Sequence, residues 1–299
     1  MAGYEIVPRS ERDQLGETPF WDGATQKLWW CDIVGKTVKR FDPSSGRIER
    51  WPMPKYVSGV IPSEDGHALV MLVDGVYRLD LESGATTEFT RPDTDPRNRS
   101  NEVRTDPQGR LWLGTMFNNI GPGGEDVPVA ADNGSVFCIA PDGFAKRMLS
   151  GINITNTFCW SPDGLSFYTN DTKRRVIWVF DYDPDGPALH NQQVFAEGDV
   201  APGNPDGGAM DEEGCLWSAR WGGSRFVRFT PAGKIDREIE LPAKQPSSCA
   251  FGGADRKTLY MTSARQGQDD LPPDALDGSL FVTRVDVAGL PMPRFASAG

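Results

Sequence analysis

Short apolar stretches, each introduced by a turn rich in Asp, Gly and Pro, recur along the whole chain. Each unit is followed by a second strand-like stretch that ends in another turn, as in GVYRLDLESG (75–84) and GSVFCIAPDG (134–143). Short apolar stretches bounded by such turns predict many β-strands rather than long helices. The six copies of the unit lie at residues 21–33, 62–72, 106–116, 161–171, 211–221 and 252–264.

One large apolar residue occupies a corresponding place in each copy. These anchor residues are Trp29, Leu69, Trp112, Phe167, Trp217 and Leu259. Successive anchors are 40, 43, 55, 50 and 42 residues apart. Six units of about 50 residues, each with several short strands, match the blades of a β-propeller. No linker or shift in composition divides the chain. We therefore predict an all-β fold, a six-bladed β-propeller with a central metal site, formed as a single domain by residues 1–299.

The repeat also predicts where the anchors and the longest loops lie. A four-stranded blade cannot bury both faces alone, so the anchors are expected to pack neighbouring blades together. Successive strands of a blade alternate in direction, so the start of its first strand and the loop after its second strand lie at the same end. The stretches 91–100, 117–133 and 266–277 are therefore expected to surround one mouth of the ring, as a lid or substrate wall.

Composition narrows the class of partner. The chain has 31 basic and 42 acidic residues and a net charge of −11. This balance argues against nucleic acid or an anionic membrane as the main partner, because both require a basic surface. The longest apolar run, 68–73, is far too short to cross a membrane, and the first ten residues contain no apolar signal segment.

Cysteine and histidine usage excludes two common kinds of site. The cysteines are odd in number, scattered and without a CxxC pair, which predicts reduced, buried thiols in a cytoplasmic protein rather than disulfides. The two histidines, His67 and His190, lie in polar segments and are expected at the surface. Serine-hydrolase triads and His-rich zinc sites are therefore poor candidates. The cysteines are Cys31, Cys138, Cys159, Cys215 and Cys249.

A set of polar residues recurs at the innermost strand predicted for each blade. If each anchor lies on the second strand, the innermost strand lies about 11 residues upstream, and Glu17 precedes the first of these positions. Equivalent positions on six inner strands converge around the central channel. A water-filled channel tolerates polar residues, which is the simplest explanation of the pattern. The six positions are Thr18, Ser58, Asn101, Asn156, Asp206 and Ser248.

The chemical types in this set favour a cation. Glu17 and Asp206 would approach one another near a low-dielectric core, which is costly unless a cation neutralises them. The amide oxygens of Asn156 and Asn101 would complete an all-oxygen set that suits Ca²⁺, Mg²⁺ or Mn²⁺, with Zn²⁺ or Fe²⁺ admissible at low coordination number. Arg99 could offer its guanidinium to a polyol or oxyanion at the same mouth; alternatively, it is an ordinary surface arginine.

At these residues the chain resembles the gluconolactonase/regucalcin (senescence marker protein) family of six-bladed propellers, nearly end to end. Each motif is short, but their order and spacing together are specific. Two departures fall at the substrate mouth. The family's usual Asn-Asp-Gly reads Asn101-Glu102-Val103, and a Glu of some animal members is replaced by Asn119. The motifs are LGETPFW (15–21), RSN (99–101), DPQGRLWLGTM (106–116), ITN (154–156), PDG (205–207) and CAFGG (249–253).

The resemblance implies roles for individual residues. Glu17, Asn156 and Asp206 would be the ligands of one divalent cation, and Asp206 would also accept or donate a proton. Arg99 and Asn101 match the family's substrate contacts. Family members open sugar lactones to aldonic acids, and some bind Ca²⁺ in a regulatory role.

The resulting hypothesis is a metal-dependent hydrolase that opens an aldonolactone of five or six carbons. The cation would polarise the carbonyl, and a water bound to the metal or held by Asp206 would attack. The expected partner is a small sugar lactone, and the protein is expected to be a monomer or weak homo-oligomer. One alternative is a promiscuous aryl-lactone or phosphotriester hydrolase with a mouth lined by Tyr56, Phe117, Phe158 and Trp221. Another is a non-catalytic Ca²⁺-binding regulatory propeller.

Overall fold

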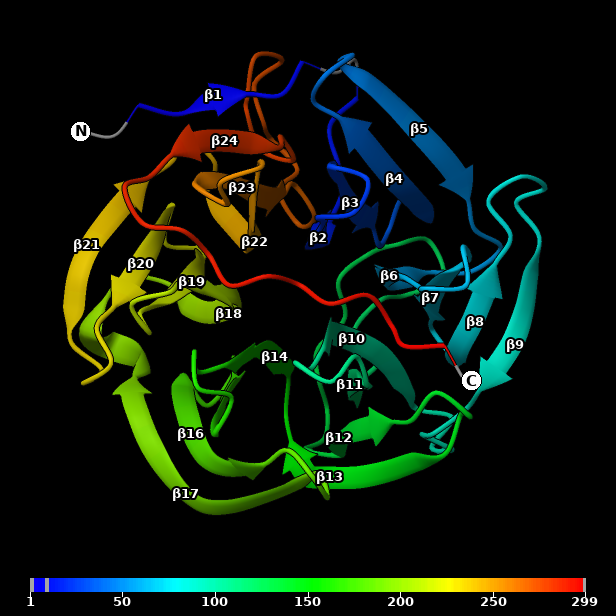
Figure 1. The fold of residues 1–299 in the computed structure, drawn as a ribbon. Coiled ribbons are helices and arrows are strands. Elements are labelled where there is room, and N and C mark those ends of the chain that lie inside the picture. The colour runs from blue at the N-terminus through cyan, green and yellow to red at the C-terminus, as the bar shows by residue number, and fades with distance from the viewer. Residues whose placement is uncertain (1–2, 9–10, 298–299) are drawn as a thin grey trace.

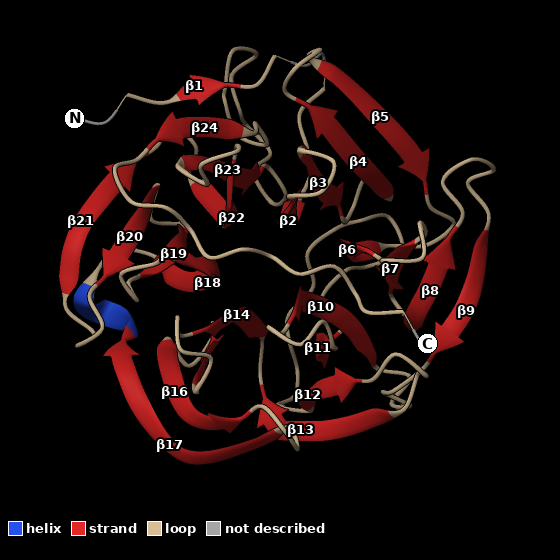
Figure 2. Cartoon of the chain, viewed as in Figure 1, coloured by secondary structure: helices blue, strands red, loops and turns tan. Residues whose placement is uncertain are grey.

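The computed structural model describes residues 3–8 and 11–297. Within them, six four-stranded antiparallel sheets are arranged around a common axis, and in five of them the chain order of the strands runs from the centre to the rim (Figure 1). This arrangement confirms the predicted all-β, six-bladed propeller. The helical content of the described residues is one short 3₁₀ turn, η1 (Gly198–Val200), between β17 (Ala188–Glu197) and β18 (Asn204–Met210) (Figure 2).

The first three blades follow one another in chain order. Blade 1 contains β2 (Gly16–Asp22), β3 (Lys27–Asp32), β4 (Thr37–Asp42) and β5 (Arg47–Pro52). Blade 2 contains β6 (Val57–Pro62), β7 (Ala68–Leu72), β8 (Gly75–Leu79) and β9 (Thr86–Thr90). Blade 3 contains β10 (Asn98–Thr105), β11 (Leu111–Phe117), β12 (Gly134–Ile139) and β13 (Ala145–Ile152).

The remaining blades complete the ring, and the last one combines both ends of the chain. Blade 4 contains β14 (Thr155–Trp160), β15 (Ser166–Asp171), β16 (Val176–Asp183) and β17 (Ala188–Glu197). Blade 5 contains β18 (Asn204–Met210), β19 (Leu216–Trp221), β20 (Arg225–Phe229) and β21 (Ile235–Glu240). Blade 6 contains β22 (Gln245–Gly252), β23 (Thr258–Ala264), β24 (Phe281–Arg284) and β1 (Glu5–Ile6). Pairing of β1 with β24 closes the ring.

The recurring Asp-Gly turns have a common local cause. In the turn between β10 and β11, Asp106 Oδ1 accepts the backbone amides of Gln108 and Arg110, and Gly109 takes the left-handed backbone conformation (φ +79°). In the matching turn of blade 5, Asp211 Oδ1 accepts the amides of Glu213 and Cys215. A side chain that captures amides two and four residues on stabilises the turn that the spacing predicted.

All six anchors lie on the second strand of a blade and are buried, as predicted. Trp112 on β11 packs against Phe167 and Trp160 of blade 4, with ring centroids 4.7 and 5.3 Å apart. Trp217 on β19 packs edge-on against Phe251 of blade 6, at 5.9 Å. Trp112, Phe167 and Trp217 therefore join neighbouring blades, whereas the ring of Trp29 stacks on Trp51 of its own blade at 5.4 Å.

Three further sequence predictions can be compared with the structure. All five cysteines are free thiols and buried, and both histidines are exposed. No helix in the described part of the chain is long and apolar enough to cross a membrane.

Candidate functional site

A cavity of about 430 Å³ opens at one mouth of the central channel and brings together the five residues singled out from the sequence. These five residues come from four blades, so their side chains lie close together only because the blades form a closed ring. Two of the three predicted loops contribute to its rim, through Asp126 and Val127 of 117–133 and Gln266 of 266–277. Of the third stretch, 91–100, Arg99 lines this cavity, while residues 91–96 line a separate one. The five residues are Glu17, Arg99, Asn101, Asn156 and Asp206.

A break in strand pairing aims these side chains into the channel. The register between the first two strands shifts at the polar position in every blade. Glu17 and Asn156 are the last paired residues before the shift, whereas Asn101 and Asp206 lie within it. Such bulges bend a strand and redirect its side chains. The polar ring therefore occupies two successive strand positions rather than the single equivalent position that a constant offset from the anchors predicts.

The two predicted carboxylates are in an environment that disfavours their charge. Burial, followed by repulsion from Glu102, raises the pKa of Glu17 to about 8. Burial, followed by repulsion from Glu17 and Glu102, raises the pKa of Asp206 well above its usual range. Neither carboxylate forms an ion pair with a lysine or arginine among the described residues, and Glu17 Oε2 accepts the Thr18 amide at 3.1 Å. Such a pair fits a site for a divalent cation.

The amide oxygen of Asn156 is the third candidate ligand. Asn156 Nδ2 donates to Thr172 Oγ1 at 2.8 Å, and its Oδ1 accepts from Asn101 Nδ2 at 3.1 Å on the cavity side. The described residues contain no metal-binding group of three or more His, Cys, Asp or Glu side chains. A cation at Glu17 and Asp206 would therefore depend on amide oxygen as well, and a hard oxygen set of this kind suits Ca²⁺, Mg²⁺ or Mn²⁺.

Arg99 is buried in the cavity wall and is held by neutral groups. Its Nε and Nη2 donate to Asn119 Oδ1 at 3.0 and 2.8 Å, and its Nη1 donates to Asn101 Oδ1 at 2.7 Å and to the Ser100 carbonyl at 2.8 Å. Burial lowers the pKa of Arg99 to about 10, so the side chain stays charged at neutral pH. The possibility that Arg99 is an ordinary surface arginine is therefore wrong.

Sequence reasoning did not assign a function to a second buried charged pair. Glu102 and Arg104 lie directly beyond the cavity, with Glu102 Oε1 and Arg104 Nη1 3.0 Å apart. Glu102 also accepts the amides of Val103 and Thr157 at 3.0 and 3.2 Å. Their spacing of two residues on one strand was a signal, since it places both side chains on one face.

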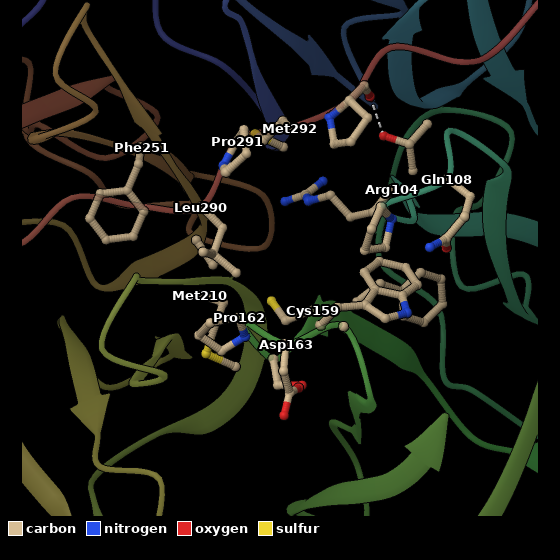
Figure 3. A pocket seen from close by; sticks show the side chains of 18 of the residues that line it. Arg104, Gln108, Cys159, Pro162, Asp163, Met210, Phe251, Leu290, Pro291 and Met292 are labelled. Atoms are coloured by element: carbon tan, nitrogen blue, oxygen red, sulfur yellow. Dashed lines mark hydrogen bonds between the residues drawn. The ribbon is translucent and has the colours of Figure 1, made fainter. Parts of the chain in front are cut away.

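A second cavity, of about 320 Å³, lies at the opposite end of the channel (Figure 3). It shares no lining residue with the first cavity and includes none of the five predicted site residues. The residues that line it come from the blade turns and from the C-terminal segment. Met210, Phe251 and Leu290 lie on one side of it, and the Arg104 side chain extends toward its centre (Figure 3). The chemistry predicted from the sequence therefore belongs to one mouth of the channel.

The four aromatic residues that would favour the alternative hydrolase do not gather at one mouth. Trp221 lines the first cavity, but Phe158 is buried and lines the second one. Tyr56 and Phe117 are absent from the lining of either cavity, and Tyr56 Oη instead donates to the Gly121 carbonyl at 2.9 Å.

Comparison with known proteins finds relatives that span nearly the whole chain. The family model described as SMP-30/Gluconolactonase/LRE-like region matches residues 15–265. The chain is 34% identical to 6-deoxy-6-sulfogluconolactonase of Pseudomonas putida, over 94% of this chain and 95% of that protein. It is 33% identical to L-arabinolactonase of Azospirillum brasilense, over 99% and 96% of the respective chains. Among solved structures, a calcium-binding protein, regucalcin, from Agrobacterium tumefaciens superposes with a TM-score of 0.89 at 30% identity, covering 98% of this chain and 97% of that one.

Proposed function

We propose that this chain, which belongs to the SMP-30/gluconolactonase/LRE-like family, is a metal-dependent lactonase that opens a sugar lactone to the aldonic acid. One observation carries the proposal. Two carboxylates from different blades, the half-buried Glu17 and the buried Asp206, line one cavity with the amide of Asn156. Burial, and after it repulsion between carboxylates, raises the pKa of both groups, and a divalent cation would relieve this cost of carrying negative charge. The relatives named as lactonases support the reaction class.

Glu17, Asn156 and Asp206 would hold the cation, which when bound supplies Lewis-acid polarisation of the lactone carbonyl. Arg99 and Asn101 bind and orient the substrate through hydrogen bonds to its ring oxygen or hydroxyls. An Oδ atom of Asp206 accepts a proton from the attacking water as the water oxygen bonds to the carbonyl carbon. The same atom returns the proton to the ring oxygen when the ester bond breaks, so the product is the hydroxy acid.

The site geometry also limits the substrate. A cavity of about 430 Å³ lies within the range of small-molecule pockets and accommodates a lactone of five or six carbons. Arg99, Asn101 and Asn119 present polar groups to the cavity, and Leu15, Ile33 and Met116 add apolar surface to it. A lining with both kinds of group suits a sugar ring, which has hydroxyl edges and C–H faces.

The proposal is tested by measuring acid release from a panel of fresh sugar lactones. Protein stripped of metal is restored with Ca²⁺, Mg²⁺, Mn²⁺, Zn²⁺ or Fe²⁺ singly. Acid release should require a cation, and Asp206→Ala should lose both cation binding and turnover by more than about 100-fold, since even outer partners of metal ligands contribute 10–100-fold. Retained turnover in Asp206→Ala with any of these cations would contradict the proposal.

Arg99→Ala is the matched variant on the substrate side of the cavity. It should lower kcat/KM by about 10- to 100-fold, the value of one hydrogen bond to a charged group, and leave cation affinity unchanged. An unchanged kcat/KM would remove Arg99 from the site. Cation binding by the wild-type protein without acid release from any lactone would instead favour the regulatory Ca²⁺-binding alternative.

A further inference from the structure

Behind the candidate ligands, blade 4 contains a buried chain of polar side chains that touches two of them. Asn170, near the end of β15, is fully buried, and Thr172 follows in the next turn and lines the cavity. We propose that Asn170 and Thr172 are positioning residues that orient the Asn156 amide and hold the Asp206 backbone for cation binding. This inference rests on the proposed function but concerns residues to which that function gives no role.

The chain begins at the backbone of Asp206. Asn170 Nδ2 donates to the Asp206 carbonyl at 2.7 Å and to Thr157 Oγ1 at 2.9 Å. Thr157 Oγ1 itself donates to the Asp206 carbonyl, so two side chains of blade 4 hold the backbone of blade 5 at this residue. A carbonyl oxygen can only accept, so the nitrogen of the Asn170 amide must face Asp206. The oxygen of that amide must then point the other way.

The next contact transfers this direction to Asn156. Thr172 Oγ1 donates to Asn170 Oδ1 at 3.3 Å. A hydroxyl has one proton, so toward Asn156 it can only accept, and it accepts from Asn156 Nδ2 at 2.8 Å. The oxygen of Asn156 is thereby turned away from Thr172 and toward the cavity. The orientation of a candidate metal ligand thus follows from the position of a backbone carbonyl in the neighbouring blade.

The cavity side of Asn156 agrees with this orientation but cannot maintain it during turnover. Arg99 can only donate, so Asn101 turns its oxygen to Arg99 and its nitrogen to Asn156 Oδ1. Arg99 and Asn101 are also the groups proposed to bind the lactone. When they engage substrate, the contact with Thr172 is the one that continues to hold the Asn156 amide.

Loss of the Thr172 hydroxyl should therefore weaken cation binding. The oxygen and nitrogen ends of an amide are nearly equal in shape, so Asn156 can turn once Thr172 no longer selects one orientation. In the turned state it presents N–H donors to the cation in place of an oxygen. Outer partners that orient metal ligands typically contribute 10–100-fold to metal affinity, which sets the expected effect.

The experiment compares Thr172→Val, which keeps the shape and removes the hydroxyl, with Thr172→Ser, which keeps the hydroxyl. Mn²⁺ binding to metal-stripped protein is followed by electron paramagnetic resonance, and unfolding is followed by calorimetry. Thr172→Val should bind Mn²⁺ at least about 10-fold more weakly, and Thr172→Ser should bind within about threefold of wild type. Wild-type affinity in Thr172→Val, or no recovery in Thr172→Ser, would overturn the inference.

Thr262→Val is the matched control. Thr262 lies on β23 of blade 6, is fully buried, accepts from Ser247 Oγ at 2.9 Å and donates to the Ser248 carbonyl at 3.1 Å. Its removal should lower the unfolding temperature without changing Mn²⁺ affinity, because it forms no hydrogen bond with a candidate ligand. If Thr262→Val lost as much Mn²⁺ affinity as Thr172→Val, the loss would reflect a general destabilisation of the fold. That result would contradict a positioning role for Thr172.

A second variant and a separate assay complete the test. Should Thr172→Val fail to fold, Asn170→Asp keeps the shape of Asn170 but turns an acceptor toward the Asp206 carbonyl, and it should weaken Mn²⁺ binding similarly. Lactone hydrolysis is measured in parallel. If wild type binds Mn²⁺ and Thr172→Val does not, yet no lactone is opened by either, the proposed activity fails while the inference stands. If wild type binds no divalent cation, both fail.

Discussion

At the residue scale, the site is marked by backbone conformations that the local sequence disfavours. Thr18 and Thr157, which directly follow Glu17 and Asn156, have φ values of 51° and 52°. A β-branched residue in the left-handed region is costly and persists only where surrounding contacts determine it. Here the contacts are hydroxyl bonds to the next blade, from Thr18 Oγ1 to the Ser58 carbonyl at 2.7 Å and from Thr157 Oγ1 to the Asp206 carbonyl.

The raised pKa of Glu17 predicts how pH affects the protein without its cation. The pKa of Glu17 is about 8 in the folded protein and 4.5 in the unfolded chain, so the folded protein holds this proton more tightly. The contribution of the protonated Glu17 to the free energy of unfolding is therefore fully present below about pH 4.5 and is lost as pH rises through 8. The buried Asp206 carboxyl acts in the same direction. A cation binds the deprotonated pair, so its stabilising effect should increase with pH. The unfolding temperature of stripped protein should fall between pH 6 and 9, and Mn²⁺ should raise it more at pH 9 than at pH 6.

Glu17→Gln provides the control for this prediction. It cannot deprotonate at this position, so the stripped variant should lose less stability between pH 6 and 9 and should gain little from Mn²⁺ at either pH. Equal Mn²⁺-induced shifts at both pH values in the wild-type protein would show that the carboxylates do not titrate as their burial requires.

At the element scale, the strands could be predicted from the sequence and the bulges could not. The anchors and the Asp-Gly turns are local signals, so they located every second strand and the inner strands before them. The bulges depend on how two strands pair, and the sequence of one strand alone does not specify that pairing. They determine whether a side chain such as Asn101 or Glu17 points into the channel. Asn170 and Thr172 escaped notice for the same reason. As residues they form an unremarkable Asn-x-Thr sequence at a strand end, and their partners come from blades 4 and 5.

In blades 3 and 5 the aspartate of the turn also accepts a hydrogen bond from the anchor tryptophan. A substitution in blade 5 measures how much these contacts contribute to stability. Asp211 is fully buried, and its Oδ2 accepts Trp217 Nε1 at 2.9 Å and Arg228 Nε at 2.8 Å. Arg228 keeps Glu213 and Asp236 as partners. Asp211→Ala still removes four buried hydrogen bonds, two to the side chains of Trp217 and Arg228 and two to backbone amides, and at about 1 kcal/mol each it should lower the free energy of unfolding by about 3–5 kcal/mol. Chemical denaturation measures this loss, and Mn²⁺ affinity should not change because the turn lies at the other end of β18.

Asp163, in the turn between β14 and β15 of blade 4, is the matched variant. It is exposed, and its Oδ1 accepts the Ser161 hydroxyl and the Leu165 amide at 2.5 and 3.0 Å. Asp163→Ala should therefore cost only about 1 kcal/mol, the usual net value of a hydrogen bond. Similar losses for the two variants would mean that the contacts of Asp211 with Trp217 and Arg228 contribute little.

At the scale of the whole molecule, the two ends of the channel have different tasks. The cation cavity opens at the end where the inner strands begin. At the other end, the C-terminal segment crosses the ring and reaches blade 2 at Phe295 (Figure 1). The segment bonds to four blades, through the Leu290 amide to Met210, the Phe295 amide to Pro62, the Ala296 amide to Gly109, and Arg294 to Asp22. It therefore ties the ring together without reaching the candidate ligands.

Deletion of residues 290–299 should separate stability from function. The deletion removes Phe295, which is buried against Phe89, and so exposes the apolar surface that Phe295 covers. It also removes the Arg294–Asp22 ion pair and opens the cavity of about 320 Å³ to solvent. Burial of one large apolar side chain contributes about 1.5–3 kcal/mol, and each kcal/mol shifts the Tm of a chain this size by about 2–4 °C, so the Tm should fall by about 5–10 °C. Below the new Tm, Mn²⁺ affinity and kcat should stay within about threefold of wild type, because the ligands are held by hydrogen bonds between inner strands. An unchanged Tm would show that β1 and β24 suffice to close the ring, whereas a large loss of Mn²⁺ affinity would show that the two ends of the channel are coupled.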